Sequence, residues 1–520
     1  MIDKGSTPSV PLLGKILSEG SPRFWVIGVG ICLLGVLIRT IIGPLLIDDA
    51  YIYFRYALNA ASGRGLVYNP GQMVFGATSP IYTFILTLGA IAGLNLIHAS
   101  VLLGVALDFI SAMLLLAIGK KVGTDLTGWL SALLVSLAPK AVIPSLSGME
   151  TSLFTLLVTL CLACLVYQRA GAAIILAGIA GATRPEGLAL LGVVVVYVAL
   201  QERRVRFRES FLAATPILLW LVISRIFYRE WIPNSIRAKA VVFPGFPNPL
   251  HDSVLIMRYI SNPFEFTSTI PELGWMNLAI LCVGGIGLIH VIRGSKAIRP
   301  FVIWSVIIGA AYAVVNRSMF PWYLGPFFPL SALALAVALG RFTDSDQLHA
   351  WLDRSLPHAA GVVRASILAV FGFMLSASSI AAGRVVRQDQ DHREAVYLRM
   401  GEWFSDHLRP DEVVASVEIG AISYGYRGPV LDLTGLVSPE VLPFYADPQF
   451  QFHYPHTLPP EAVEQLAPPV LVTYDKAIAD MRETSWFQRA YPNIRIVETP
   501  HPVYGTLMVF TASGVPLPPP

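Results

Sequence analysis

Two adjacent carboxylates, Asp48 and Asp49, stand at the end of the first long apolar segment of the chain. A carboxylate can take the proton from a weak nucleophile, such as a hydroxyl group, as that group attacks its partner. The pair is followed by aromatic residues, by Arg55 and by the turn-rich run 63–71, which together predict a long ordered segment outside the membrane. Charged residues also flank many membrane spans without doing chemistry, so position alone leaves both interpretations open.

The composition indicates a polytopic membrane protein embedded in a lipid bilayer. Hydrophobic residues make up 54% of the 520 positions and charged residues only 14%, with a mean hydropathy of +0.62. The formal net charge of +3 argues against nucleic acid as a partner, because nucleic-acid binding normally requires a basic patch. The four cysteines all fall in apolar segments, which indicates packing and not a disulfide framework or a zinc site.

Apolar windows of about 20 residues predict membrane-spanning helices. The eleven windows are 24–47, 99–118, 128–144, 151–168, 171–183, 186–200, 211–228, 276–294, 300–316, 322–340 and 361–382. Basic residues fall on every second loop, which predicts a cytoplasmic N-terminus and an external segment after the last span. The window 80–97 breaks this alternation, so we predict that it is an interfacial or re-entrant helix.

The composition changes at residue 384 and predicts two domains. Residues 1–383 form the predicted transmembrane domain, which includes the outer loop 48–97 with juxtamembrane helices. Residues 384–520 carry short β-branched runs and turn signals, which predict an extracytoplasmic soluble α/β domain. Its expected strands are 413–417, 430–433, 470–474, 494–497 and 507–510, and its expected helices are 390–408, 459–466 and 476–490.

Five polar clusters share the predicted outer side of the membrane. They are 48–49, 147–151, 183–187, 233–239 and Arg317 with 321–323. Ionisable residues against hydrophobic segments are costly and usually face a cavity or one another. We therefore favour one shared site on the outer face, although any single cluster is equally consistent with a helix cap or a structural ion pair.

In order along the chain, several segments resemble motifs of the GT-C superfamily of membrane glycosyltransferases. These segments are 48–56, 63–71, 147–151, 183–187 and 233–235, with 420–424 and 432–436 in the soluble domain. The chain looks most similar to the actinobacterial terminal arabinofuranosyltransferases, which use decaprenyl-phosphate arabinose. It departs from that branch at 76–80.

The resemblance implies a GT-C-like catalytic membrane domain and an inverting glycosyltransferase. Such an enzyme takes a sugar, arabinofuranose in that branch, from a polyprenyl-phosphate donor and attaches it to a hydroxyl of a cell-envelope glycan acceptor. The reaction would occur on the outer face of the bacterial plasma (inner) membrane. No cofactor is expected, and a divalent cation is left open, since some members of the superfamily need one and two carboxylates alone do not define a metal site.

The chemistry assigns a role to each candidate residue. Asp48 is the predicted base, and Asp49 is expected to orient it, bind the acceptor or help hold a metal. Fixed cations would stabilise the phosphate that leaves. The predicted phosphate-binding residues are Arg184, Arg237, Lys239 and Arg317, and the predicted sugar- or acceptor-binding residues are Glu150, Glu186, Tyr51, Asn234 and Trp231.

Two other classes of protein fit the same composition. A transporter or flippase for a lipid-linked sugar usually has matched broken helices, whereas only one candidate broken pair is found here, at Arg184 and Pro185. Asp108 and Lys140 fall inside predicted spans and are expected either to pair with each other or to lie nearer the helix ends. A non-catalytic scaffold of glycan assembly remains an alternative if the acidic pair has no catalytic role.

Overall fold

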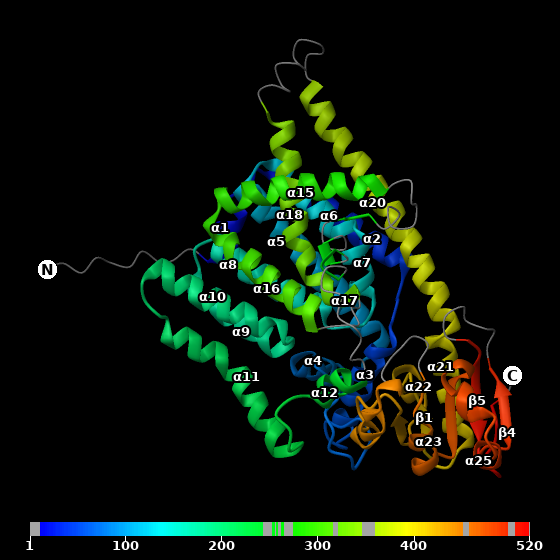
Figure 1. Cartoon of the computed structure of the whole chain (residues 1–520). Helices are drawn as coiled ribbons and strands as arrows, with labels where there is room; N and C mark the ends of the chain where they lie inside the picture. Colours follow the sequence, from blue (N-terminus) through cyan, green and yellow to red (C-terminus); the bar gives the residue numbers. More distant parts are fainter. Residues whose placement is uncertain are drawn as a thin grey trace.

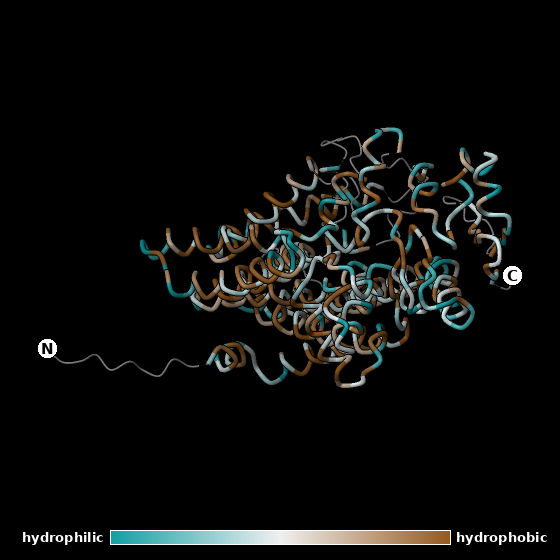
Figure 2. Tube along the Cα trace, turned by 90° about the horizontal axis from the view of Figure 1, so that it is seen from below, coloured by the Kyte–Doolittle hydropathy of each residue, from teal (hydrophilic) through white to brown (hydrophobic). Residues whose placement is uncertain are grey.

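The computed structural model describes most of the chain. The described residues are 11–242, 252–254, 256–257, 262–264, 274–315, 321–345, 359–450, 457–497 and 505–518. A large helical body occupies one side and a smaller domain with a β-sheet lies at the C-terminal end (Figure 1). The tube coloured by hydropathy is mostly hydrophobic in the helical body and more hydrophilic near the C-terminus (Figure 2).

The helical body is built from apolar helices, most of which lack a strongly polar face. They are α1 (Leu12–Leu17), α2 (Pro22–Ile42), α3 (Asp48–Ala61), α4 (Pro80–Ile91), α5 (Leu96–Val122), α6 (Asp125–Leu137), α7 (Pro139–Leu146), α8 (Thr151–Val166), α9 (Ala170–Thr183), α10 (Glu186–Glu202), α11 (Phe207–Phe227), α12 (Asn234–Val242), α15 (Gly274–Gly294), α16 (Arg299–Val315), α17 (Pro321–Leu324), α18 (Phe328–Thr343) and α20 (Ala359–His392). Helices that are hydrophobic all round are typical of membrane spans, which confirms the predicted fold class of a polytopic helical membrane protein.

The number of spans differs from the prediction. Among the described residues, seven helices are long and apolar enough to cross a membrane, or eight if the bent pair α6–α7 counts as one span. The two helices of that pair meet at 45°, where Pro139 begins α7. Helices α8 and α9 have only 16 and 14 residues, so the predicted count of eleven is not confirmed.

The segment predicted to lie outside the membrane starts earlier than predicted. Helix α2 ends at Ile42 because Gly43 adopts φ +74° and Pro44 follows it. Residues 43–47 continue without helical structure, and the N–H of Leu45 donates to the carbonyl oxygen of Leu146 at 2.9 Å. The predicted interfacial helix 80–97 is the shorter α4, because α5 already begins at Leu96.

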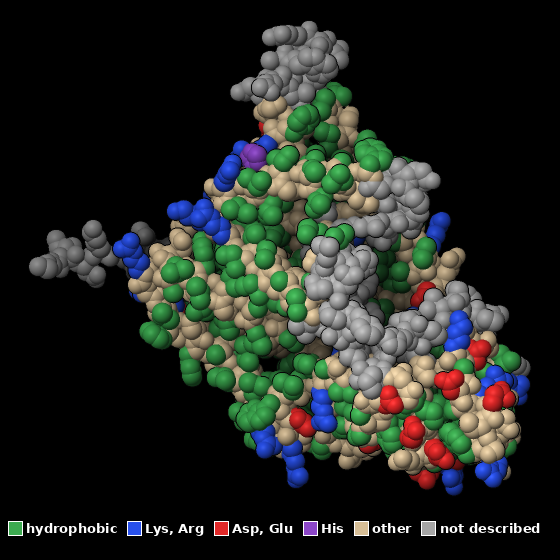
Figure 3. Space-filling model, in the orientation of Figure 1, with side chains coloured by type: hydrophobic (Ala, Val, Ile, Leu, Met, Phe, Trp, Pro, Cys, Tyr) green, Lys and Arg blue, Asp and Glu red, His purple; other side chains and the backbone are tan. Residues whose placement is uncertain are grey.

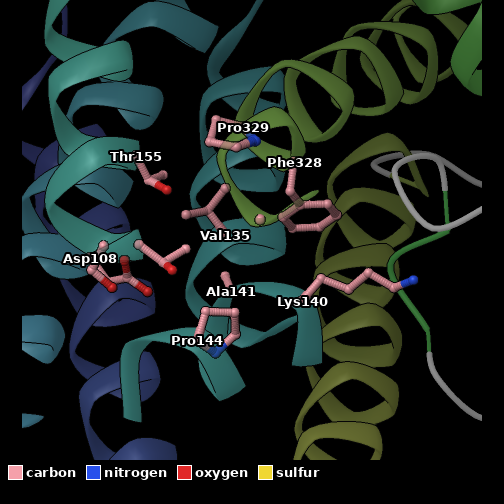
Figure 4. A pocket seen from close by; sticks show the side chains of 11 residues that line it. Asp108, Val135, Lys140, Ala141, Pro144, Thr155, Phe328 and Pro329 are labelled. Carbon is pink, nitrogen blue, oxygen red and sulfur yellow. The ribbon is translucent and has the colours of Figure 1, made fainter. Parts of the chain in front are cut away.

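A buried ion pair lies inside the helical body. Arg39 on α2 contacts the Asp108 carboxylate on α5 at 2.7 Å and donates to Ser145 Oγ at 2.8 Å. A small pocket between the helices is lined by Asp108 and Lys140, and Lys140 extends away from Asp108 (Figure 4). The expected pairing of Asp108 with Lys140 is therefore wrong, because Asp108 forms its ion pair with Arg39.

The polar segments gather at two opposite ends of the helical body. At one end, Lys121 contacts Glu19 at 2.7 Å and Tyr167 donates to the carbonyl of Ala117. At the other end, α3, α4 and α12 lie together beside the C-terminal domain (Figure 1). Hydrophobic side chains cover much of the surface between the two ends, and acidic side chains concentrate on the C-terminal domain (Figure 3).

The C-terminal domain contains a five-stranded sheet with the order β2-β1-β3-β5-β4. Its elements are α21 (Glu394–His407), β1 (Val414–Ser416), α22 (Gly420–Gly425), β2 (Val430–Asp432), η4 (Pro439–Ala446), α23 (Pro460–Leu466), β3 (Val470–Tyr474), α24 (Ala479–Arg482), α25 (Ser485–Ala490), β4 (Asn493–Ile496) and β5 (Leu507–Thr511). Strands β2, β1 and β3 are parallel, whereas β5 and β4 are antiparallel. All five expected strands are present, and the soluble α/β domain is confirmed as part of the fold.

The domain is packed against the helical body and not merely tethered to it. The 34-residue helix α20 leads directly into α21 (Figure 1). One hydrophobic cluster contains Phe54 and Tyr56 from α3 together with Tyr397, Phe404 and Ile422 from the C-terminal domain. Helix α3 and the C-terminal domain therefore share a core.

Replacing Arg39 with Met should destabilise the protein, because Asp108 would then be buried without its partner. Breaking one side of a buried ion pair costs about 3 to 5 kcal/mol. We expect a clear fall in the unfolding temperature measured in detergent, whereas the exposed Arg23→Met should match the wild type. The double variant Arg39→Met/Asp108→Leu should recover most of the loss, and an unchanged single variant would contradict this role.

Candidate active site

Asp48 begins α3 and holds the start of α22. Its two carboxylate oxygens accept hydrogen bonds from the backbone N–H groups of Gly420 and Ala421, both at 2.8 Å. A carboxylate is favourable at a helix N-terminus, where N–H groups lack partners inside the helix. Glycine is required at 420 because a Cβ there would overlap the backbone of Asp48. The predicted base is therefore engaged with the C-terminal domain.

The environment of Asp48 raises the pKa of its carboxyl group. Burial and the neighbouring Glu418 carboxylate raise the pKa of Asp48 from 3.8 to about 7, although the two backbone hydrogen bonds act in the opposite direction. Asp48 therefore titrates near neutral pH while it binds the domain.

Asp49 faces a different set of groups. In the part of the chain that the structure describes, Asp49 makes no hydrogen bond or ion pair. Burial lowers the pKa of Lys239 on α12, but Tyr323 and Asp49 raise it, and the net shift is upward. Burial raises the pKa of Tyr53 well above its usual value, and Glu150 and Asp49 act in the same direction. Asp49 thus lies within electrostatic range of Lys239 and Tyr53.

Lys239 supplies a cation with donors to spare. Its Nζ donates to Tyr323 Oη on α17 at 2.7 Å, and no ion pair involves it among the described residues. An ammonium group has three N–H donors, so two are left to bind an anion. Tyr323 also lies against Arg184, whose guanidinium carbon is 5.4 Å from the centre of the tyrosine ring. The phenol therefore connects the two cations.

Arg184 stands between two glutamates. Its Nη1 contacts Glu150 Oε1 at 2.7 Å and its Nη2 contacts Glu186 Oε1 at 2.8 Å. Tyr312 Oη also donates to Glu186, and Trp304 Nε1 donates to the backbone carbonyl of Glu186 at 2.9 Å. The predicted role of Arg184 as a direct phosphate ligand is thus disfavoured, because its charge is already matched by two carboxylates. Glu186 is likewise occupied and has little capacity left for a sugar.

Glu150 keeps one free acceptor at the site. Its Oε2 is buried and has no hydrogen-bond partner within the described parts of the chain. A buried acceptor without a partner costs free energy, unless a ligand or water fills the position. Nearby, the hydroxyl groups of Tyr53 and Thr78 lie 3.1 Å apart. Glu150, Tyr53 and Thr78 therefore present polar atoms suited to sugar hydroxyls.

Arg237 lies in more exposed surroundings than Lys239. It is more than half exposed, and its nearest carboxylate is Glu230 at 3.9 Å, which is also exposed. Residues two apart on a helix do not share a face, which disfavours the predicted joint phosphate contact of Arg237 and Lys239. Arg317 lies outside the described residues.

Asn234 forms hydrogen bonds within the protein. The Nδ2 of Asn234 donates to the carbonyl oxygens of Gly435 at 2.7 Å and Leu436 at 2.9 Å. Both of its donors are therefore used within the protein, which disfavours the predicted sugar contact.

Tyr51 and Trp231 lie in quite different surroundings. Tyr51 is buried against the rings of Phe54 and Tyr424. Trp231 is 58% exposed and lies beside Arg225. In the described parts of the chain, neither residue forms a hydrogen bond or ion pair with Lys239, Arg184 or Glu150, so their predicted sugar contacts gain no support.

The sequence reasoning missed Tyr53, Tyr312 and Glu418. Tyr53 could have been found, because it follows Asp49 by four residues and therefore shares its helix face. Tyr312 and Glu418 come from distant segments and carry no local signal. Among the described residues, no group of three or more His, Cys, Asp or Glu could hold a metal ion.

Comparison with solved structures identifies the fold. The chain is similar to ArnT from Cupriavidus metallidurans bound to undecaprenyl phosphate, with a TM-score of 0.59 and 14% identity over 96% of this chain and 100% of that chain. It is also similar to the Archaeoglobus fulgidus oligosaccharyltransferase tethered with an acceptor peptide containing the NVT sequon, with a TM-score of 0.54 and 11% identity over 90% of this chain and 71% of that chain. Both are GT-C glycosyltransferases, so this chain has a GT-C fold.

The sequence comparisons add one family. Residues 384–510 match a family described as "Domain of unknown function (DUF8728)". No curated protein sequence gives a significant match. The resemblance to the GT-C superfamily is thus confirmed at the level of fold, whereas the arabinofuranosyltransferase branch is not confirmed.

The raised pKa of Asp48 predicts a pH dependence of stability. Because its pKa in the folded protein lies above the ordinary value, the folded state binds the proton more tightly than the unfolded state. The stabilisation is complete below about pH 4 and is lost as the pH rises through about 7. We therefore expect the unfolding temperature of the wild type to fall between pH 5 and pH 8 more steeply than that of Asp48→Asn.

The exposed Glu440→Gln serves as the matched control, since it removes a carboxylate of the same domain that lies far from α22 in sequence. This control should follow the wild-type curve. Parallel curves for the wild type and Asp48→Asn would rule out titration of Asp48 in this range.

Proposed function

We propose that the protein is an inverting glycosyltransferase that moves a sugar from a polyprenyl-phosphate donor to a hydroxyl of a cell-envelope glycan. The observation that carries the proposal is the meeting of Asp49, Lys239, Tyr323, Arg184 and Glu150 at one end of a GT-C fold. These residues come from five separate segments, so their convergence is a property of the tertiary structure. A carboxylate, a cation and a sugar-binding acceptor are the groups that such a transfer needs.

Asp49 is the better candidate for the base. Asp48 uses both carboxylate oxygens to hold α22, whereas Asp49 is free of such bonds among the described residues and lies near Lys239. In the proposed reaction the acceptor hydroxyl attacks the anomeric carbon and gives its proton to Asp49. The bond between the anomeric carbon and the phosphate oxygen breaks on the opposite face, and the polyprenyl phosphate leaves with the electron pair.

Lys239 is the proposed phosphate ligand. Its two remaining N–H donors can bind phosphate oxygens, and a fixed cation stabilises the charge that develops there. Arg184 then acts behind it, through Tyr323, as a charge that orients the site. The undecaprenyl phosphate bound to ArnT supports a donor of this kind, since that protein shares the fold over nearly the whole chain.

The identity of the sugar is a finer proposal. Glu150, Tyr53 and Thr78 offer acceptors and donors for sugar hydroxyls. Arabinofuranose is the first sugar to test, because several segments resemble motifs of the arabinofuranosyltransferases. We also propose a bacterial plasma membrane location, with the N-terminus in the cytoplasm and the site and C-terminal domain outside. The clustering of basic loops such as 203–208 away from the site supports this orientation.

The test is transfer of radiolabel from a panel of polyprenyl-phosphate sugars, including decaprenyl-phosphate arabinose, to a cell-envelope acceptor. Asp49→Asn should reduce transfer by about 10²–10⁴-fold, since it removes the base. Lys239→Met should reduce it by about 10²-fold or more, since it removes the phosphate cation. Arg237→Met removes an exposed charge from the same helix and should stay within about threefold of the wild type.

Other outcomes identify the other classes of protein. Movement of a lipid-linked sugar across vesicles without a new glycosidic bond would instead indicate a transporter or flippase. Neither transfer nor movement from any donor, with a folded protein, would favour a non-catalytic scaffold. Full activity of Asp49→Asn would refute the proposed base, and full activity of Lys239→Met would refute the proposed phosphate ligand.

A further inference from the structure

Two of the contacts between the C-terminal domain and the membrane domain lie next to residues of the proposed site. The first is the contact of α22 with α3. Asp48 receives the N–H groups at the start of α22, and Arg55, two turns further along α3, donates to the carbonyl oxygens of Ser423 at 2.5 Å and Tyr426 at 2.6 Å. Because Arg55 is only 5% exposed, this contact is well shielded from water. Both ends of α22 thus form hydrogen bonds with side chains of α3.

The second point is the loop that follows β2. The buried Asp432 carboxylate accepts the backbone N–H groups of Thr434 at 2.8 Å and Val437 at 3.0 Å, which folds the loop back on itself. The carbonyl oxygens of Gly435 and Leu436 then face outward and accept both donors of Asn234.

Asn234 fixes the position of α12. It is the first residue of that helix, and its backbone N–H donates to the carbonyl oxygen of Phe75 at 2.9 Å. The same surface approaches closely at Gly76, where a Cβ would lie 2.9 Å from the carbonyl oxygen of Leu436. Helix α12 also packs against η4 of the C-terminal domain. The start of α12 is therefore held by the loop 432–438.

Each point of contact is next to one group of the proposed reaction. Asp48 directly precedes Asp49, and Asn234 begins the short helix that carries Lys239. We propose that the C-terminal domain is a positioning module, in which α22 sets the base Asp49 and the loop 432–438 sets the phosphate ligand Lys239. This inference rests on the proposed function. It assigns a role to residues 384–510, which match the domain of unknown function.

The two contacts predict different kinetic effects. Asn234→Ala removes the hold on α12, so Lys239 loses its position and the KM for the polyprenyl-phosphate donor should rise by about tenfold or more, with a smaller change in kcat. Gly420→Ala pushes α22 away from Asp48, so kcat should fall by about tenfold or more while the KM for the donor stays near the wild-type value. Asp48→Asn is the milder variant for the same contact, should Gly420→Ala fail to fold.

A binding measurement separates this inference from the proposed function. Undecaprenyl phosphate binding to the full-length protein in detergent requires no transfer. Its affinity should fall about tenfold or more in Asn234→Ala and stay unchanged in Asp48→Asn. Ile494→Ser changes an exposed side chain of the edge strand β4 and should alter neither kcat, KM nor affinity.

The outcomes for the positioning role differ from those for the proposed function. A fall in kcat alone in every variant would indicate loss of folded protein and would overturn the positioning role, as would wild-type phosphate affinity in Asn234→Ala. Loss of phosphate affinity in Asn234→Ala, in a protein that transfers no sugar from any donor, would support the hold on α12 while it refutes the proposed function.

Discussion

The attachment of α3 to the C-terminal domain depends on two side chains, Asp48 and Arg55, that lie two helical turns apart. Asp48 meets the positive end of α22 and Arg55 meets its negative end. A helix of six residues has little stability of its own, because its nucleation is unfavourable and its terminal backbone groups lack partners. Side chains of α3 form hydrogen bonds with the terminal backbone groups of α22 and so stabilise this short helix. The same bonds orient α3 against the C-terminal domain. This mutual dependence explains why a shared hydrophobic core surrounds the contact.

The same arrangement gives Asp48 and Asp49 different surroundings. Adjacent residues on a helix point in directions about 100° apart, so Asp48 and Asp49 cannot both face one partner. One carboxylate is directed to backbone N–H groups of the domain, and the other remains near Lys239. The proposed proton transfer to Asp49 thus depends on Asp48, which does not itself take the proton.

Much of this architecture could be predicted from the sequence, because long apolar windows and alternating β-branched runs are strong local signals. The five strands and the helical membrane domain follow from such signals. The roles of Asp48 and Arg237 could not be predicted, since each depends on which helix face meets another segment. Helix α22 was missed for the same reason: its stability comes from Asp48 and Arg55, which are more than 360 residues away.

The buried pair of Arg39 and Asp108 also has a consequence for how the chain is inserted into the membrane. Arg39 lies near the end of the first long helix, and its carboxylate partner is made 69 residues later. An arginine at the centre of a membrane span costs about 2.5 to 3.5 kcal/mol, but Arg39 lies in the last turn of α2, from which a long side chain can reach water or lipid headgroups. The ion pair with Asp108 forms only after α5 has been synthesised, so the burial of Arg39 between the helices is a late step in the assembly of the membrane domain.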